Sequence, residues 1–153
     1  MNDIYLTPDG YKKLDEELTY LRTVKRQEVA QRLHEALAEG GELIENAEYE
    51  AAKNEQAFVE GRIQELEYLL ANAKVVEHLP SDEVVIGSKV TIAYDDGEEE
   101  TYTVVGAAEA APEEGLISNE SPLGKALLGH KAGDTVQVEA PNGSFSVKIV
   151  RIE

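Results

Sequence analysis

A long N-terminal stretch of the chain, residues 11–39, has helical periodicity and contains no glycine or proline. Apolar residues recur every three or four positions, the spacing that gathers them on one face of an α-helix. They are Tyr11, Leu14, Leu18, Leu21, Val29, Leu33 and Leu37. Thr7-Pro8 supplies a hydroxyl cap and a proline at the first helical position, and Gly40-Gly41 ends the helix. About thirty helical residues span on the order of 45 Å, which is long for a globular protein.

A second helix with a narrow apolar seam follows almost at once. Its seam residues are spaced by four, three, four and three positions, the pattern of a coiled coil. They are Val59, Ile63, Leu66, Leu70 and Ala73. Nearer the turn we expect Ala47, Ala51 and Ala52 on the same side, where small residues allow two helices to approach closely. The sequence therefore predicts an antiparallel coiled-coil hairpin. Its polar flanks favour projection from the body over packing flat on a sheet.

The second half of the chain has the alternating pattern of β-strands. Turn signals lie at 95–97 and 141–143, and Ser121-Pro122 caps a short helix at 123–128. We expect strands at 88–94, 100–105, 116–118, 135–139 and 144–152. These elements predict a compact antiparallel sheet with one short helix against it.

Two domains follow from this organisation, 1–79 and 80–153, with Pro80 marking the break. The predicted fold class is α+β. An N-terminal antiparallel coiled-coil hairpin precedes the small β-rich domain. Aromatic residues make up only 6% of the chain, which favours two modest cores over one large core.

Composition excludes several classes of protein. The chain has no cysteine, which rules out disulfides and thiolate metal sites and suits a reducing cytoplasm, where we place it. No signal peptide and no apolar run of membrane-spanning length is visible. Both halves are acidic and the net charge is −17, so autonomous binding to duplex nucleic acid is not expected. Nucleotide loops, nucleophile elbows and zinc motifs are absent from the sequence, and no catalytic constellation of the usual kind replaces them.

The turn between the two predicted helices has an unusual composition. Glu42 and Glu45 are three residues apart, so one face can present both carboxylates at the tip of the hairpin. Leu43 and Ile44 lie between them at an exposed turn. The helix dipole favours acids in a first helical turn, which explains the glutamates but not the apolar pair.

This tip resembles that of the GreA/GreB transcript-cleavage factors of bacterial RNA polymerase. In that family a Gly-acid-Leu-x-Glu-Asn-Ala-Glu-Tyr segment caps a long coiled coil, and residues 41–49 read Gly-Glu-Leu-Ile-Glu-Asn-Ala-Glu-Tyr. Residues 21–26, 60–63 and 121–129 are similar to the family's first helix, second helix and C-terminal helix segment. The resemblance covers nearly the whole chain, in order, and is closer to GreA than to GreB.

The resemblance implies a fold and a role for each half of the chain. The C-terminal domain would have an FKBP-like fold and dock on the rim of the polymerase secondary channel through Ser121, Pro122 and Leu123. The coiled coil would reach through the channel to the active site. There Glu42 and Glu45 would help to hold the second Mg²⁺ and to position an attacking water, and the polymerase would hydrolyse backtracked RNA.

The remaining expectations concern RNA, metal and catalysis. The resemblance also implies that Lys53 and Arg32 contact the nascent RNA 3′ end within the complex. The isolated chain is expected to bind no cofactor, because Mg²⁺ takes only one or two carboxylates along with phosphate oxygens and waters. We therefore expect a monomeric accessory factor that completes the polymerase active site and is inert as an enzyme by itself.

The sequence departs from the family pattern at the tip, and alternatives stay open. Glu42 stands where the family often has Asp, Ile44 where many members have Lys, and Ala38 where a basic residue is frequent. One alternative is a Gre-fold homologue that occupies the channel and inhibits or modulates polymerase without cleavage. Another is an acidic coiled-coil adaptor unrelated to transcription. A prolyl isomerase is disfavoured, because 81–153 contains only three aromatic residues for its pocket.

Overall fold

The computed structural model describes residues 3–40, 47–78 and 81–153. Its contacts divide the chain into a helical unit, Tyr11–Asn72, and a second unit that combines Met1–Gly10 with Ala73–Glu153. The predicted boundary at residue 79 stays a prediction. The contacts place the first ten residues of the chain with its C-terminal half.

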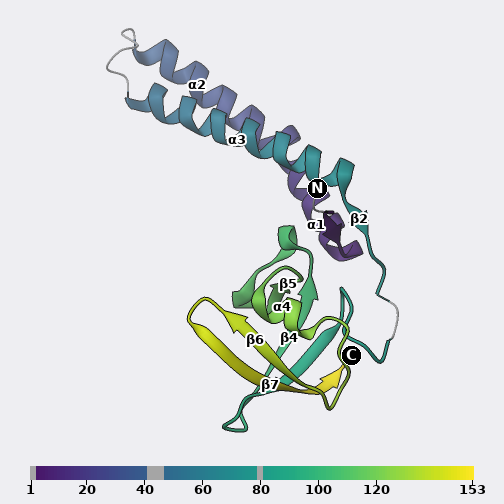
Figure 1. Ribbon diagram of the computed structural model, residues 1–153. Helices are drawn as coiled ribbons and strands as arrows, with labels where there is room; N and C mark the ends of the chain where they lie inside the picture. The colour runs from purple at the N-terminus through teal and green to yellow at the C-terminus, as the bar shows by residue number, and fades with distance from the viewer. Residues whose placement is uncertain (1–2, 41–46, 79–80) are drawn as a thin grey trace. The chain divides into compact units, whose positions relative to one another are not determined.

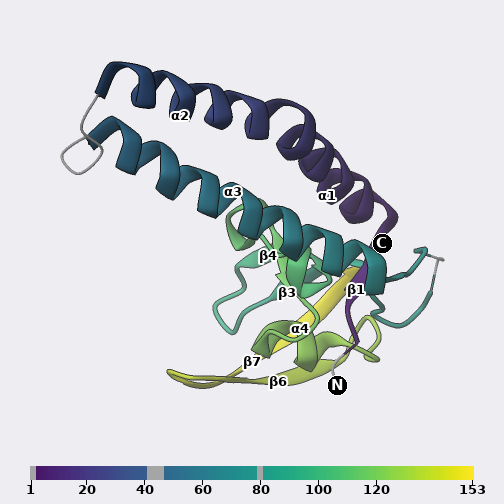
Figure 2. The same ribbon diagram turned by 90° about the horizontal axis from the view of Figure 1, so that it is seen from above.

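Two long antiparallel helical arms form the hairpin (Figures 1 and 2). The first arm consists of α1 (Pro8–Tyr20), a π-helical turn η1 (Leu21–Lys25) and α2 (Arg26–Gly40). The second arm is α3 (Ala47–Asn72), which packs against α2. The predicted hairpin is therefore confirmed. The π turn is an addition, since a wider turn of this kind cannot be told from an α-helix by apolar spacing.

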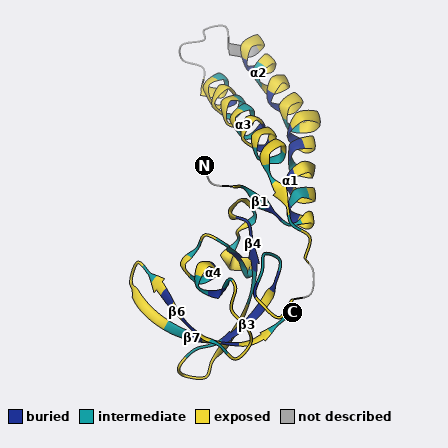
Figure 3. Ribbon diagram, turned by 45° about the vertical axis from the view of Figure 1, so that its right-hand side comes forward, coloured by how far each residue is buried: buried dark blue, intermediate teal, exposed yellow. Residues whose placement is uncertain are grey.

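Burial follows the sides on which the two arms face each other, as Figure 3 shows in dark blue. The buried residues of the seam are Leu14, Leu18, Leu21, Val29, Ala36, Ala52, Val59, Ile63 and Leu66. Near the tip the expected seam shifts. Leu37 is 42% exposed and Ala36 takes its place, because seven residues after Val29 return almost to the same helix face whereas eight overshoot it.

The same seven-residue spacing determines which alanines at the start of α3 are buried. Ala52 is fully buried and lies seven residues before Val59, on the same face. Ala47 and Ala51 are exposed, so the expectation that all three alanines line the seam is wrong for two of them.

The second unit contains a five-stranded sheet with the order β5-β4-β3-β7-β6. Its strands are β3 (Lys89–Ala93), β4 (Glu99–Val105), β5 (Leu116–Ser118), β6 (Thr135–Ala140) and β7 (Gly143–Ile152). The short helix α4 (Pro122–Leu127) packs against β6. The predicted β-rich half with one helix is confirmed.

The sheet is mixed rather than wholly antiparallel, because β5 pairs with β4 in parallel. Two 3₁₀ turns, η3 (Ala107–Glu109) and η4 (Pro112–Glu114), lie in the connection that carries the chain back along β4 as far as Thr103, the partner of Leu116. A return of this length makes parallel pairing possible, whereas a two-residue turn makes only antiparallel pairs.

The core of this unit is aliphatic. Its buried members are Val84, Val90, Ile92, Val104, Ile117, Leu127, Val136, Val138, Val147 and Ile149. The inward residues of β6 and β7 alternate with exposed ones, as period-two burial requires.

Two strands that the sequence did not indicate join the ends of the hairpin. Tyr5–Leu6 (β1) pairs in parallel with Lys74–Val75 (β2), and Leu6 is fully buried. The chain that enters the hairpin and the chain that leaves it therefore lie side by side.

Candidate functional site

The two acids expected to act at the tip, Glu42 and Glu45, lie outside the described residues. In the chain they come between the last residue of α2, Gly40, and the first of α3, Ala47. The described first turn of α3 also carries acids, Glu48 and Glu50, where the positive end of the helix dipole favours them.

Lys53 lies one turn further along α3 and is exposed. Its Nζ lies 5.7 Å from the centroid of the Tyr49 ring, within the range of a cation–π contact. Lys53 therefore presents a positive charge in the first two turns of the second arm, on the tip side of the hairpin.

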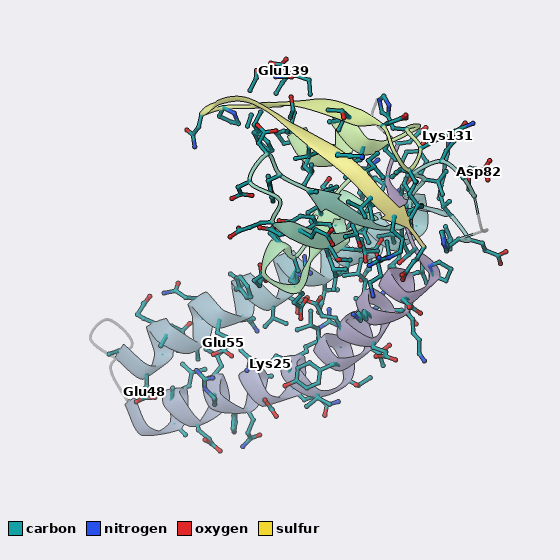
Figure 4. The ribbon with its side chains drawn as sticks, turned by 90° about the horizontal axis from the view of Figure 1, so that it is seen from below. Lys25, Glu48, Glu55, Asp82, Lys131 and Glu139 are labelled. Carbon is teal, nitrogen blue, oxygen red and sulfur yellow. The ribbon has the colours of Figure 1, made fainter. Side chains whose placement is uncertain are left out.

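The basic side chains of the first arm are engaged with acids of the second arm. Arg32 Nη1 lies 2.6 Å from Glu55 Oε2, and Lys25 Nζ lies 2.9 Å from Glu55 Oε1. Figure 4 shows Lys25 and Glu55 facing each other between the arms. Hydrogen bonds from Lys25 and Arg32 lower the pKa of Glu55, and the same contact with Glu55 raises the pKa of Lys25.

Two further ion pairs extend this set away from the tip. Arg26 donates to both carboxylate oxygens of Glu60 at 2.9 Å, and Arg22 lies 3.0 Å from Glu67. Each of these basic residues of the first arm is thus paired with an acid across the hairpin. Arg32, one of the two residues expected to contact RNA, would have to leave or share Glu55 to do so.

Ser121 is the N-cap of α4 and holds its start firmly. Its Oγ accepts from the Gly124 N–H at 3.1 Å and donates to the Ser118 carbonyl at 2.7 Å. A Cβ on Gly124 would lie 2.0 Å from that same carbonyl, so only glycine allows α4 to pack this closely on the end of β5. The Ser121 hydroxyl is thus part of the local structure.

The three leucines of this helix segment differ in burial. Leu127 is fully buried in the sheet core, and Leu123 and Leu128 are half-buried against it. Pro122 is exposed at the first helical position. Of the three residues expected to bind a partner, Pro122 is therefore the one most open to contact.

An open hollow of about 390 Å³ lies elsewhere on the second unit. Tyr94 and Phe145 line it, with ring centroids 6.3 Å apart, together with Asp95, Asp96 and Ser146. The remaining aromatic residue of this half, Tyr102, donates a hydrogen bond to Glu100, which raises its pKa. The lining of the hollow thus combines two aromatic rings with two carboxylates.

Metal ligands do not gather in the part of the chain that the structure describes: no group of three or more His, Asp or Glu side chains is arranged to hold an ion there. Within the same described ranges, no helix is long and apolar enough to cross a membrane.

Comparison with known protein families covers both halves of the chain. Residues 79–153 match the family described as transcription elongation factor, GreA/GreB, C-terminal, and residues 4–75 match transcription elongation factor, N-terminal. The chain belongs to the GreA/GreB family of transcription elongation factors. The family resemblance inferred from the tip and the Ser121 segment is confirmed.

GreA proteins of several bacteria resemble this member of the family over nearly its full length. Transcription elongation factor GreA of Thermoanaerobacter pseudethanolicus is 55% identical, over 97% of this chain and 96% of its own. That of Bacillus subtilis is 51% identical, over 96% and 94%. Among solved structures, GreA factor homolog 1 (Gfh1) of Thermus thermophilus is 35% identical, over 99% of each chain, with a TM-score of 0.46.

One set of contacts in this Gre-family chain was not predicted from the sequence. Glu109 of η3 binds Thr7 at the start of α1, 102 residues away in the chain. The sequence gives one local indication of this contact. Thr7 is the N-cap of α1, but the third helical residue is Gly10 and not the acid that completes a capping box.

Proposed function

We propose that this protein binds bacterial RNA polymerase and stimulates cleavage of backtracked RNA by the polymerase active site. The observation that carries the proposal is the pair Glu42 and Glu45, placed in the connection of a long hairpin in a chain of the Gre family. Transcription elongation in bacteria takes place in the cytoplasm, where we place the protein. It acts there as a monomer.

The hairpin is suited to carry a pair of acids to a distant site. Its second arm, α3, has 26 residues and so extends about 39 Å at ~1.5 Å per residue. Ion pairs between the arms, such as Arg26 with Glu60, add lateral connections along it. The apolar seam supplies most of the stability, because exposed ion pairs contribute little each.

At the tip, the donor set fits a magnesium ion. Carboxylate oxygens are the hard ligands that Mg²⁺ prefers, and one or two of them suffice where phosphate oxygens and waters complete the shell. Bound there, the ion would make a metal-held water a better nucleophile toward RNA. The role of Glu42 and Glu45 is to supply negative charge and to orient that water, and Lys53 and Arg32 offer positive charge to the RNA backbone.

The C-terminal unit serves as the docking element. Pro122 is exposed at the start of α4, and the Ser121 cap keeps the helix start in one conformation. A rigid, exposed segment loses little conformational entropy when a partner binds it. Contact through Ser121, Pro122 and Leu123 would hold the factor on polymerase while the tip acts. By itself the factor contributes ligands to a site that its partner owns, and is not an enzyme.

The deciding experiment replaces each tip acid by glutamine. Glu42→Gln and Glu45→Gln keep side-chain shape but remove the charge, so RNA cleavage by a stalled polymerase complex should slow at saturating factor. Loss of one electrostatic stabiliser costs roughly 2–4 kcal/mol, on the order of a hundredfold in rate. Glu45 should be the more sensitive. Glu42→Asp should keep or raise activity, since Asp is frequent in the family.

Glu50→Gln is the matched control, because Glu50 is an exposed acid in the first turn of α3. With this variant, the stalled polymerase complex should cleave RNA at the same rate as with the parent protein. If both tip variants also do so, the acids are only helix-terminal charges, and an inhibitory homologue or an adaptor becomes the better account. Cleavage of RNA by the repurified factor without polymerase would contradict the proposal from the other side.

A further inference from the structure

Helix α1 begins with half of a capping box. Thr7 Oγ1 accepts from the Gly10 N–H at 3.0 Å, as an N-cap hydroxyl does. In a full capping box, an acid at the third helical position accepts in return from the N-cap N–H. Here that third position is Gly10, which has no side chain to do so.

Glu109 of η3 takes the place of the missing acid. The Thr7 N–H donates to Glu109 Oε2 at 2.8 Å, and the Thr7 hydroxyl donates to Glu109 Oε1. Both bonds involve a carboxylate, and such charge-assisted bonds are stronger than neutral ones. A residue far away in sequence, but in the same structural unit, thus completes the cap of α1.

Two glycines make room for this arrangement. A Cβ on Gly10 would lie 1.9 Å from Glu109 Oε1, in the space that the carboxylate occupies. A Cβ on Gly106, three residues before Glu109, would lie 1.7 Å from the Tyr5 carbonyl oxygen. A side chain at position 106 would separate the N-terminal segment from η3, whereas one at position 10 would displace the Glu109 carboxylate.

The β1–β2 pair holds the same N-terminal segment through backbone hydrogen bonds. The Lys74 N–H donates to the Ile4 carbonyl and the Val76 N–H to the Leu6 carbonyl, both at 2.8 Å. Lys74 Nζ also lies 3.0 Å from Asp3. Strands of two residues are marginal by themselves, so further contacts are needed to keep this pair formed.

We propose that Glu109 is a positioning residue that clamps the start of α1 to η3. It does so by supplying the acid of the α1 capping box, and thereby keeps β1 paired with β2. Resting on the function proposed above, the clamp limits the freedom of the chain segment from which the tip-bearing hairpin begins. Reduced freedom at the base raises the effective concentration of the tip at its target.

The first test is independent of polymerase. Hydrogen exchange of the Lys74 and Val76 amides reports on β1–β2, and that of the Gly10 amide reports on the first turn of α1. Glu109→Ala should speed all three about fivefold, the factor expected when a helix cap is lost. Glu113→Ala removes an exposed acid from the adjacent η4 turn and should leave them unchanged. Unchanged exchange in Glu109→Ala would overturn the clamp.

A double variant separates capping from clamping. Gly10→Glu combined with Glu109→Ala restores a local capping box but not the long-range link, and the vacated carboxylate site leaves room for the new side chain. The Gly10-position amide should regain protection, while Lys74 and Val76 should stay fast. Recovery of all three amides would show that Glu109 acts only as a helix cap.

Cleavage assays then test the positioning role. Glu109→Ala should lower the rate at saturating factor severalfold with little change in the concentration needed for saturation, and Gly10→Glu should not rescue it. Rescue, or an unchanged rate beside an active parent protein, would overturn the positioning role. If instead the polymerase complex cleaves RNA at the parent rate with Glu45→Gln, the proposed tip chemistry is wrong. The hydrogen-exchange results for Glu109→Ala still determine whether the clamp exists.

Discussion

Arg62 and Glu17 join the two arms of the hairpin through two parallel hydrogen bonds, at 2.8 Å from Nε and 2.9 Å from Nη2. The Arg62 side chain is 28% exposed, and the contact with Glu17 is the main reason why its pKa is raised. Such a fork-shaped contact fixes the register of one arm against the other, which a single-point contact does not.

Arg62→Lys should therefore destabilise the protein although it keeps the charge. Lysine cannot form the paired bonds, and we expect a loss of about 0.5–1 kcal/mol in the free energy of unfolding, measured in urea. A double-mutant cycle with Glu17→Gln isolates the pair. The single-contact pair Arg22–Glu67 is the comparison, and an equal coupling energy for the two pairs would contradict the importance of the fork.

The ion pairs of Glu55 predict a dependence of stability on acid pH. Because Lys25 and Arg32 lower the pKa of Glu55 from its ordinary 4.5, folding favours the carboxylate form. Its contribution is present above pH 4.5 and is lost as the pH falls through the lowered folded value. Thermal unfolding followed by circular dichroism should show this loss in the parent protein and a shallower one in Glu55→Gln. If the melting temperatures of the two proteins fall in parallel with pH, the Glu55 ion pairs do not contribute this pH dependence.

Two glycine-to-alanine changes should have opposite effects. Gly61 lies within α3, and a Cβ there meets nothing within 4 Å, so Gly61→Ala should stabilise the protein by about 0.5–1 kcal/mol. Gly124→Ala would press against the Ser118 carbonyl and should destabilise it by about 1–3 kcal/mol. Unfolding midpoints measure both. A neutral Gly124→Ala would mean that α4 can move away from β5 without cost.

Pro122→Asp tests the docking element. Asp is favourable in a first helical turn, so the helix should persist and the circular dichroism spectrum should not change. Competition with a second factor for polymerase should weaken if Pro122 touches the partner. Pro112→Asp is the matched control, since Pro112 is an exposed proline at the same position of η4. Equal competition by both variants would move the interface elsewhere.

The elements that could be predicted from the sequence are those with strong local signals. Thr7-Pro8 and Ser121-Pro122 mark helix starts through side chains within three residues of the backbone that they cap. Helical periodicity continues through both arms, and turn glycines separate the strands of the sheet. The candidate tip chemistry was likewise visible as residue types, because Glu42 and Glu45 are neighbours in the chain.

Tertiary structure decided the rest, because those features depend on residues that are distant in sequence. A strand as short as Tyr5–Leu6 has no periodicity to detect, and its partner Lys74–Val75 follows only after both arms of the hairpin in the chain. The partner of Thr7 is Glu109, which no local rule selects. Local signals in the amino-acid sequence were sufficient for the two helical arms, the strands of the five-stranded sheet and the acids of the tip. Only long-range packing decided which arm residues pair and what holds the base of the hairpin, since each of these contacts forms only after segments far apart in the chain have come together.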